Sequence, residues 1–505
     1  MMRKIIFLTF WISVTAANIC AQTGEPKREF RGAWVHTVGN QQYREMTADQ
    51  MKRHFTDLLD EFEKAKINAV IFQVRPQADA FYVSSIEPWS RFITGTQGAA
   101  PHPAWDPLQF MTDECHKRGM ELHAWFNPYR VTSNNTETLC GEHLYYKKPY
   151  LFVKYGKQIY FDPGEPEARE HTLKVIADVV ERYDIDAVHF DDYFYPYKIK
   201  EKDITVDFPD GRSFAKYGKK DGFAEKNDWR RNNVNILIEA LSKTIKEIKP
   251  WVKFGISPFG VWRNVSSDPS GSNTTAGCEN YDDLYADIKL WVEKGWIDYN
   301  VPQLYFDIGH PAADYETLID WWSKNNYGEN LYIGQDISKT VKVKSRKNEN
   351  EFLNQLPQKM QMVRSNKNIH GNVWWSGYAL QRNPNGFTDS LKNYQTKIAL
   401  MPKYKRIDTI APEAVQNARA EQTAEGLFLK WDAPATDDQM QKTVYYCVYL
   451  QPEPNAKYAS PEQFEYPVAI TQKTEFKITD NHIYYAVTAL DKLQNESKPV
   501  LIRIE

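Results

Sequence analysis

Two adjacent carboxylates, Asp191 and Asp192, are the residues of this sequence best placed to do chemistry. They follow a short apolar run at 187–190 and precede the aromatic segment YFYPY. Side chains of a strand alternate between two faces, so this pattern predicts acids at the end of a buried strand. A single acid there often only caps the next loop. An acid pair followed by aromatic rings favours a catalytic or binding site instead.

The composition excludes several kinds of function. A net charge of −3 over 505 residues gives no electrostatic case for a nucleic-acid partner. No His or Cys spacing resembles a zinc site, and no Gly-rich phosphate loop is present, so we expect neither a metal nor a cofactor. The 15 Trp and 30 Tyr are numerous enough to supply sugar-stacking rings as well as core.

The N-terminus reads as a secretory signal peptide over residues 1–21. Basic residues precede an apolar run at 5–14, and small residues follow up to Ala21. That run is too short to span a membrane, and no later segment is long and apolar enough to do so. We therefore expect export to the periplasm or cell envelope, including its outer-membrane face. Cys20 raises the question of a lipid anchor, but the two residues before it fit a lipobox poorly.

Strand and helix patterns alternate eight times between residues 28 and 400. The expected strands are 30–38, 69–75, 121–128, 187–191, 253–259, 299–306, 330–336 and 371–377. The expected helices are 47–66, 107–118, 166–183, 228–248, 281–294, 314–325, 350–364 and 388–400. This count and order predict an α/β fold, a (βα)8 TIM barrel, whose active site lies at the C-terminal ends of its strands.

A second, smaller domain is expected after the barrel. Residues 401–412 read as a linker, and 413–505 contain short alternating segments separated by turn signals, as in an antiparallel sandwich. This part resembles a fibronectin type III module, with Trp431 in the place of the core tryptophan and Tyr484 or Tyr485 at the tyrosine corner. The resemblance implies a spacer, a wall-facing accessory module or a stabilising domain.

On nearly every expected strand, polar residues occupy alternate positions that share one face. This pattern is unfavourable for a barrel core and typical of a ligand pocket. In chain order these are Trp34, His36, Gln73, Arg75, His123, Trp125, Asn127, His189, Asp191, Ser257, Gln303, Tyr305, Asp307, Asp336, Trp374 and Ser376. Each one alone has an ordinary structural explanation, such as a buried histidine with satisfied hydrogen bonds. Their convergence on one end of a barrel predicts a site.

A pocket of carboxylates, amides and tryptophans suits cleavage of glycosidic bonds, which needs an acid for the leaving oxygen and a second carboxylate. We assign Asp191 as nucleophile or charge-stabilising carboxylate and Asp307 as the acid, with Asp192 and Asp336 as alternatives. An arginine at a strand end could clamp an anionic sugar substituent. The predicted substrate contacts are His36, Gln73, Arg75, His123, Asn127, Arg130, His189, Tyr193, Gln303, Tyr305 and Trp374.

Several motifs together resemble the glycosyl-hydrolase-10-like family of bacterial envelope proteins. They are REFRGAWVHTV, FQVRPQADAFYVSSIEPWS, HAWFNPYR, YDIDAVHFDDYFYPY and IDYNVPQLYF, and the resemblance covers most of residues 28–380. It implies a (βα)8 barrel, an exported protein and a glycan substrate. One type of member digests peptidoglycan strands stripped of stem peptides, in which muramic acid carries a free lactyl carboxylate that an arginine could bind.

The fourth-strand motif is also similar to two other glycosidase patterns. Tyr193 occupies the position of the catalytic Glu in the chitinase-type pattern, which disfavours that mechanism. In an α-galactosidase-like pattern, Asp191 fits the nucleophile and Asp307 the acid. Two alternatives remain open: hydrolysis of a plant or host polysaccharide, and carbohydrate binding by a barrel without activity.

Overall fold

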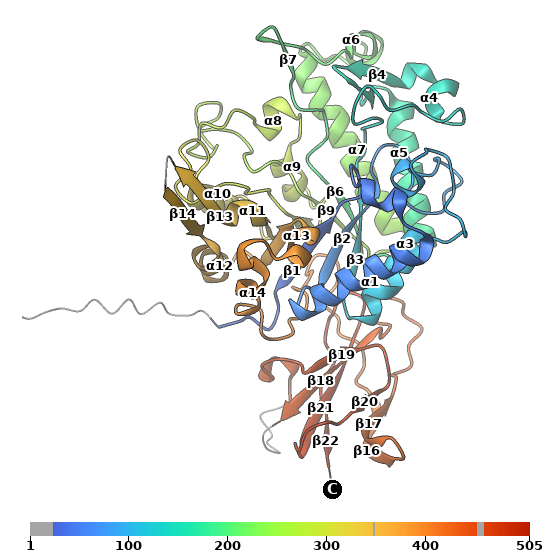
Figure 1. The fold of residues 1–505 in the computed structure, drawn as a ribbon, viewed down its shortest axis with the longest axis vertical. Helices are drawn as coiled ribbons and strands as arrows, with labels where there is room; N and C mark the ends of the chain where they lie inside the picture. Colours follow the sequence, from blue (N-terminus) through green and yellow to red (C-terminus); the bar gives the residue numbers. More distant parts are fainter. Residues whose placement is uncertain (1–23, 347–348, 452–458, 505) are drawn as a thin grey trace, which may run out of the picture.

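The computed structural model describes residues 24–346, 349–451 and 459–504. The predicted signal peptide lies outside the described residues. A large α/β barrel forms the upper part of the molecule and a small all-β module lies beneath it (Figure 1). Among the described residues, no helix has the length and apolar character needed to cross a membrane.

The barrel is a closed parallel sheet, as predicted. Its strands are β1 (Phe30–Val35), β2 (Ala69–Arg75), β3 (Glu121–Phe126), β6 (Ala187–Phe190), β9 (Lys253–Ile256), β10 (Tyr299–Asn300), β11 (Asn330–Leu331), β12 (Ile333–Asp336) and β15 (Gly371–Trp375). The sheet order β11-β10-β9-β6-β3-β2-β1-β15-β12 follows the chain. Because β11 and β12 are two halves of the seventh strand, separated at Tyr332, the sheet closes with eight strands.

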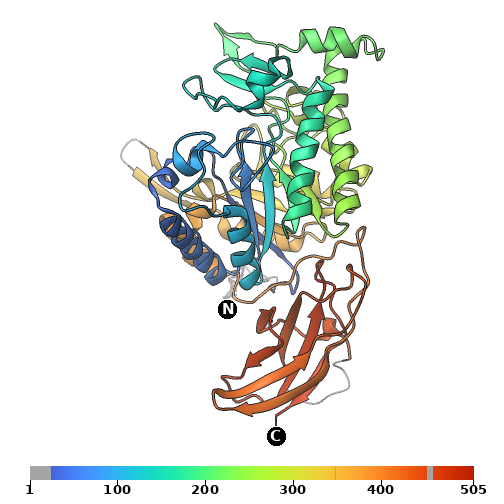
Figure 2. The same cartoon turned by 90° about the vertical axis from the view of Figure 1, so that its right-hand side faces the viewer.

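Helices surround this sheet, and α5 and α7 run side by side along one flank (Figure 2). Those between the strands are α1 (Ala48–Lys64), α3 (Pro107–Lys117), α5 (Pro166–Arg182), α7 (Lys226–Ile248), α8 (Asn280–Asp283), α9 (Ile288–Glu293), α10 (Tyr315–Lys324), α12 (Leu356–Ser365), α13 (Gly377–Arg382) and α14 (Phe387–Lys392). The apolar residues of α1 face the barrel, and its start is fixed by a capping box between Thr47 and Gln50.

Three expected helices are corrected by the structure. The helix expected at 281–294 is divided into α8 and α9. The helix expected at 350–364 begins only at Leu356, because Pro357 is favoured in a first turn and cannot be carried in a helix interior. The residues before it form β14 (Glu349–Asn354), which pairs with β13 (Val341–Arg346) as a hairpin. The helix expected at 388–400 is replaced by α13 and α14, separated by a left-handed turn at Asn383 and Gly386.

The long loops above the barrel carry further short elements. These are η1 (Gln41–Glu45), α2 (Arg91–Thr94), α4 (Leu144–Lys147), η2 (Pro149–Leu151), β4 (Phe152–Tyr155), β5 (Gln158–Phe161), β7 (Lys200–Glu201), β8 (Ile204–Thr205), α6 (Gly211–Ser213), η3 (Phe214–Gly218), α11 (Ile337–Thr340) and η4 (Pro384–Gly386). They enlarge the end of the barrel at which the strands terminate (Figure 1).

The C-terminal module consists of two antiparallel sheets around a common core. One sheet has the order β16-β17-β20 and the other β19-β18-β21-β22. The strands are β16 (Gln416–Thr423), β17 (Gly426–Asp432), β18 (Tyr445–Gln451), β19 (Ala469–Thr471), β20 (Glu475–Lys477), β21 (Tyr484–Leu490) and β22 (Val500–Arg503), with η5 (Pro461–Gln463) between β18 and β19. Trp431 and Tyr485 are buried between the sheets, which is consistent with a sandwich; the fibronectin type III relationship stays a prediction.

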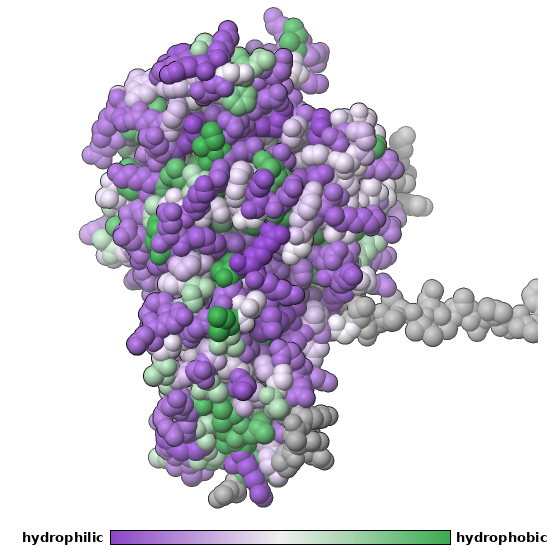
Figure 3. Space-filling model, turned by 180° about the vertical axis from the view of Figure 1, so that it is seen from behind, coloured by the Kyte–Doolittle hydropathy of each residue, from purple (hydrophilic) through white to green (hydrophobic). Residues whose placement is uncertain are grey.

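The module closes the lower end of the barrel. Met401 and Tyr404 of the connecting segment, and Leu493 of the module, are buried with the lowest layer of barrel side chains. Across the junction, Lys27 Nζ lies 3.1 Å from a carboxylate oxygen of Glu496. The surface is otherwise largely hydrophilic when seen from behind, with hydrophobic residues gathered mainly on the module (Figure 3). The upper end of the barrel is therefore the end left free for a ligand.

The middle of the barrel is filled by Tyr299, whose ring lies directly over Gly255 of the neighbouring strand. The Tyr299 hydroxyl lies 2.8 Å from Nδ1 of His123 and 3.0 Å from Nδ1 of His189. A Cβ atom at position 255 would lie 1.9 Å from the Tyr299 ring, so a glycine is required there for the ring to cross the barrel.

We therefore expect Gly255→Ala to destabilise the protein by about 1–3 kcal/mol, because the methyl group must displace a fully buried ring. Gly277→Ala is the matched control, since an added Cβ there meets nothing within 4 Å. Urea unfolding of both variants measures the difference. Equal stability of the two would show that Tyr299 does not depend on the gap at Gly255.

Candidate functional site

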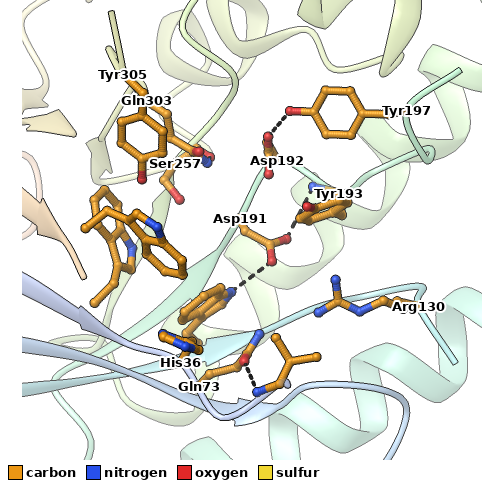
Figure 4. Close-up of a pocket in the computed structure, with 14 residues that line it drawn as sticks. His36, Gln73, Arg130, Asp191, Asp192, Tyr193, Tyr197, Ser257, Gln303 and Tyr305 are labelled. Atoms are coloured by element: carbon orange, nitrogen blue, oxygen red, sulfur yellow. Dashed lines mark hydrogen bonds between the residues drawn. The ribbon is translucent and has the colours of Figure 1, made fainter. Parts of the chain in front are cut away.

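A cavity of about 440 Å³ opens at the C-terminal ends of the barrel strands (Figure 4). Its walls come from the ends of seven strands, from β1 to β15. The lining residues are Trp34, His36, Val38, Gln73, Trp125, Arg130, Asp191, Asp192, Tyr193, Tyr197, Ser257, Gln303, Tyr305 and Trp375. Asp191 and Asp192 are the two carboxylates in this lining. No group of three or more His, Cys, Asp or Glu able to hold a metal occurs in the part of the chain that the structure describes.

Asp191 is held by hydrogen-bond donors on the side facing β3. The indole Nε1 of Trp125 donates to Oδ2 at 3.1 Å, and the amide of Asn127 lies 3.3 Å from both carboxylate oxygens. The backbone N–H of Tyr193 donates to Oδ1 at 3.3 Å. The Asn127 amide cannot turn, because its Oδ1 accepts from the backbone N–H of Arg130 at 2.8 Å. Three donors thus fix Asp191 and favour its charged form.

Asp192 lies beside Asp191 but in a different environment. The hydroxyl of Tyr197 donates a hydrogen bond to its Oδ2 (Figure 4). Burial and the neighbouring Asp191 charge nevertheless raise the pKa of Asp192 to about 7. Burial also raises the pKa of Asp191, but Arg130 and the three donors oppose that rise. Of the two, Asp192 therefore holds a proton more readily near neutral pH, and Asp191 carries the negative charge more readily.

Arg130 stands at the edge of the cavity, opposite the carboxylate pair (Figure 4). Its Nε and Nη2 both donate to the carbonyl of Pro76 at 3.1 Å, and its guanidinium lies over the ring of Tyr193. Its side chain is nearly buried. Among the described residues, no carboxylate lies within ion-pairing distance of it. A buried guanidinium without a direct ion pair is suited to receive an anion from a ligand.

Amide and imidazole groups line the side of the cavity formed by β1 and β2. Oε1 of Gln73 accepts from the backbone N–H groups of Thr37 and Val38 at 3.0 and 2.9 Å, and its buried Nε2 has no partner among the described residues. Burial lowers the pKa of His36 to about 4, so its ring is neutral. Gln303 is anchored through Nε2 to the carbonyl of Ser257 at 2.8 Å. These groups can bond neutral hydroxyl groups without changing charge.

Beneath the cavity, His123 and His189 belong to a buried hydrogen-bond chain and do not line it. The indole N–H of Trp34 can only donate, so Nε2 of His189 accepts at 3.3 Å and its Nδ1 donates to Tyr299. Tyr299 then donates to Nδ1 of His123, whose Nε2 lies 2.8 Å from Glu121. Burial lowers the pKa of both histidines. This chain of hydrogen bonds fixes the side chains that form the floor of the cavity.

Besides His123 and His189, the structure places four further predicted site residues away from the cavity. Asp307 is ion-paired with Lys342 at 2.8 Å, outside the cavity. Asp336 caps the N-terminus of α11. Arg75 is fully buried in a two-bond ion pair with Glu87 at 2.6 and 2.7 Å. Trp374 packs against Phe387 on the outer side of the sheet. None of these four residues lines the cavity.

Sequence reasoning missed Trp375 and Tyr197. The inward-facing residues of β15 are Val373 and Trp375, so the parity assigned to that strand was off by one residue. Val373 was the available signal, since it is an ordinary barrel-interior residue and fixes the parity of its neighbours. Tyr197 lies in the aromatic segment after Asp192, and nothing in the sequence singles it out from the other rings there.

The sequence matches the family model described as glycosyl hydrolase-like 10 over residues 29–354. It is 41% identical to the glycosyl hydrolase YngK of Bacillus subtilis over 98% of this chain and 96% of that protein. It is also 41% identical to the glycosyl hydrolase DigH of Escherichia coli, over 62% of this chain and 74% of that protein. A solved glycoside hydrolase domain of PgaB (BpsB) from Bordetella bronchiseptica aligns with 73% of this chain and 99% of that chain, with a TM-score of 0.48 and 12% identity.

We expect Tyr197→Phe to raise the pKa of Asp192 clearly above 7. The lost hydroxyl favours the charged form of this carboxyl, so without it the proton is held more firmly. Carboxyl ¹³C NMR titration of aspartate-labelled protein, assigned with Asp192→Asn, measures the change. Tyr305→Phe is the matched control: among the described residues, the Tyr305 hydroxyl makes no hydrogen bond to Asp192. An unchanged or lower pKa in Tyr197→Phe would contradict the assignment.

Proposed function

The chain belongs to the glycosyl hydrolase-like 10 family, and we propose that it cleaves cell-wall glycan, specifically peptidoglycan strands that lack stem peptides. The observation that carries this proposal is the unequal carboxylate pair in the cavity. One member is protonated near neutral pH and the other is charged and fixed. A glycoside hydrolase needs such a difference, because one group must give a proton while another stabilises positive charge.

In this proposal Asp192 is the general acid. Its pKa of about 7 lies near the pH at which an acid both holds its proton and releases it readily. It takes the role predicted for Asp307, which its ion pair with Lys342 keeps outside the cavity. Asp191 remains the charge-stabilising carboxylate, because three donors and the nearby Arg130 charge favour its ionised form.

Arg130 supports the choice of substrate. Muramic acid in a strand stripped of peptides carries a free lactyl carboxylate, and a guanidinium binds a carboxylate with paired, charge-assisted hydrogen bonds. In an intact strand the same position is an amide, which offers no charge. The flat rings of Trp34, Trp125 and Trp375 line the same cavity and can stack on sugar faces. Export, which such a substrate requires, rests on the predicted signal peptide.

The direct test is release of soluble glycan fragments from purified sacculi, with and without prior amidase removal of stem peptides. We expect release only after amidase treatment. Asp192→Asn should lower the rate about 100- to 10,000-fold, the range for loss of a general acid, and Asp191→Asn should also be severely impaired. Failure of folded wild-type protein to release fragments from either substrate would remove this function. Undiminished release by Asp192→Asn would remove its role as acid.

Recognition of the lactyl carboxylate is tested by Arg130→Gln. We expect KM on amidase-treated strands to rise about tenfold, the effect of losing one charge-assisted hydrogen bond. Methyl esterification of the lactyl groups should raise the wild-type KM similarly and leave that of Arg130→Gln unchanged, because the interaction is then already absent. Arg130→Lys, which keeps the charge, should lie between the two. Additive effects of the ester and the variant would show that Arg130 does not contact this group.

A further inference from the structure

Both carboxylates of the cavity come from the same end of the same strand. Glycosidases that use two carboxylates place them on opposite sides of the scissile bond, about 5 Å apart in retaining enzymes and about 6.5–9.5 Å apart in inverting ones. Asp191 and Asp192 are consecutive and both follow β6, so they approach a bound sugar from the same wall of the cavity. The lining residues facing them from β1, β2, β10 and β15 include no acid.

Asp191 is also a poor nucleophile. Its two oxygens accept from Trp125, Asn127 and the backbone of Tyr193, at 3.1–3.3 Å. Such bonds hold the carboxylate in place and prevent it from turning toward an anomeric carbon. What remains available is its negative charge, at a position that lines the cavity. It is therefore suited to accept one further N–H and to stabilise a cation beside it.

The wall next to Asp191 is aromatic. The indole of Trp125, which donates to Asp191, lies edge-on to Trp375 with ring centres 6.2 Å apart, and Trp375 lies edge-on to Trp34 at 6.4 Å. The three indole rings and Asp191 line the same cavity, which therefore offers one carboxylate acceptor beside an apolar wall. An acetamido group has the complementary shape, with an N–H on one side of its carbonyl and a methyl group on the other.

We propose that the cavity binds an N-acetylhexosamine at the scissile bond and that the sugar's own 2-acetamido oxygen is the nucleophile. This inference rests on the proposed function and narrows its substrate class. Asp191 accepts the acetamido N–H, and the methyl group lies against the tryptophans. Tyr193 occupies the place of the acid in the chitinase-type pattern, so the proton comes from Asp192 instead.

The reaction then has two steps. Asp192 gives its proton to the glycosidic oxygen as the bond from that oxygen to C1 breaks. The acetamido oxygen forms a bond to C1 on the opposite face, giving a cyclic oxazolinium ion whose N–H is held by Asp191. Water then attacks C1 and loses a proton to Asp192, and the bond between C1 and the acetamido oxygen breaks. The acetamido group and the acid are both regenerated, and the anomeric configuration is retained.

The experiment uses amidase-treated glycan strands that are de-N-acetylated and then re-N-acylated with either acetyl or trifluoroacetyl groups. Fluorine makes the amide oxygen a weak nucleophile while preserving its N–H and nearly its shape. We expect kcat on the trifluoroacetyl strands to be at least tenfold lower, with KM changed less than threefold. A sugar-fused thiazoline, N-acetylglucosamine-thiazoline, should inhibit competitively, and Asp191→Asn should bind it at least tenfold more weakly. Asp307→Asn is the matched control and should bind it as wild type does.

Equal kcat on the two acylated strands, together with no inhibition by the thiazoline, would overturn the inference while leaving the proposed hydrolase activity in place. Inversion of configuration, seen by ¹H NMR in the first product, would overturn it as well. No cleavage of the fully acetylated strands by folded protein would instead remove the proposed function and this inference with it.

Discussion

The structure depends on keeping two consecutive carboxylates buried at the end of one strand. Two like charges at this spacing cannot both be stable away from water, so one of them must hold a proton. The raised pKa of Asp192, about 7, is the result. Below that pH the pair carries one negative charge rather than two. The groups that surround the pair determine which of the two residues is charged.

The end of β3 and the turn after it favour the negative charge on Asp191 rather than on Asp192. Trp125 on β3 is in register with His189 on β6, so Asn127, two residues further, comes level with Asp191. Trp125 and Asn127 both donate to that carboxylate, and Arg130 in the following turn adds positive charge. Asp192 receives hydrogen bonds from the Tyr197 hydroxyl and the Gln303 side chain, and no cation of the described residues pairs with it directly. The asymmetry of the pair is thus a consequence of strand register.

The barrel and much of the cavity follow from the sequence, because both depend on local periodicity. Eight alternating strands and helices predict the fold, and strand parity places Gln73, Asn127, Asp191 and Gln303 at one end. What failed depends on loop conformation. The ion pair of Asp307 could not be predicted, because its partner Lys342 lies in the β13–β14 hairpin, which the sequence pattern does not indicate. The ion pair of Arg75 could not be predicted either, because its partner Glu87 lies twelve residues away in a long loop.

The end of the barrel is rich in polar residues, but few of them are free to react with a ligand. An acid or a cation at a strand end is usually paired by a nearby loop, as the Asp307–Lys342 and Arg75–Glu87 pairs show. Asp191, Asp192 and Arg130 differ, since among the described residues none of them has an oppositely charged side chain in direct contact. Leaving three ionisable groups in one cavity without direct ion pairs is unfavourable for folding alone. A ligand that supplies an anion for Arg130, an N–H for Asp191 and a leaving oxygen for Asp192 satisfies all three at once.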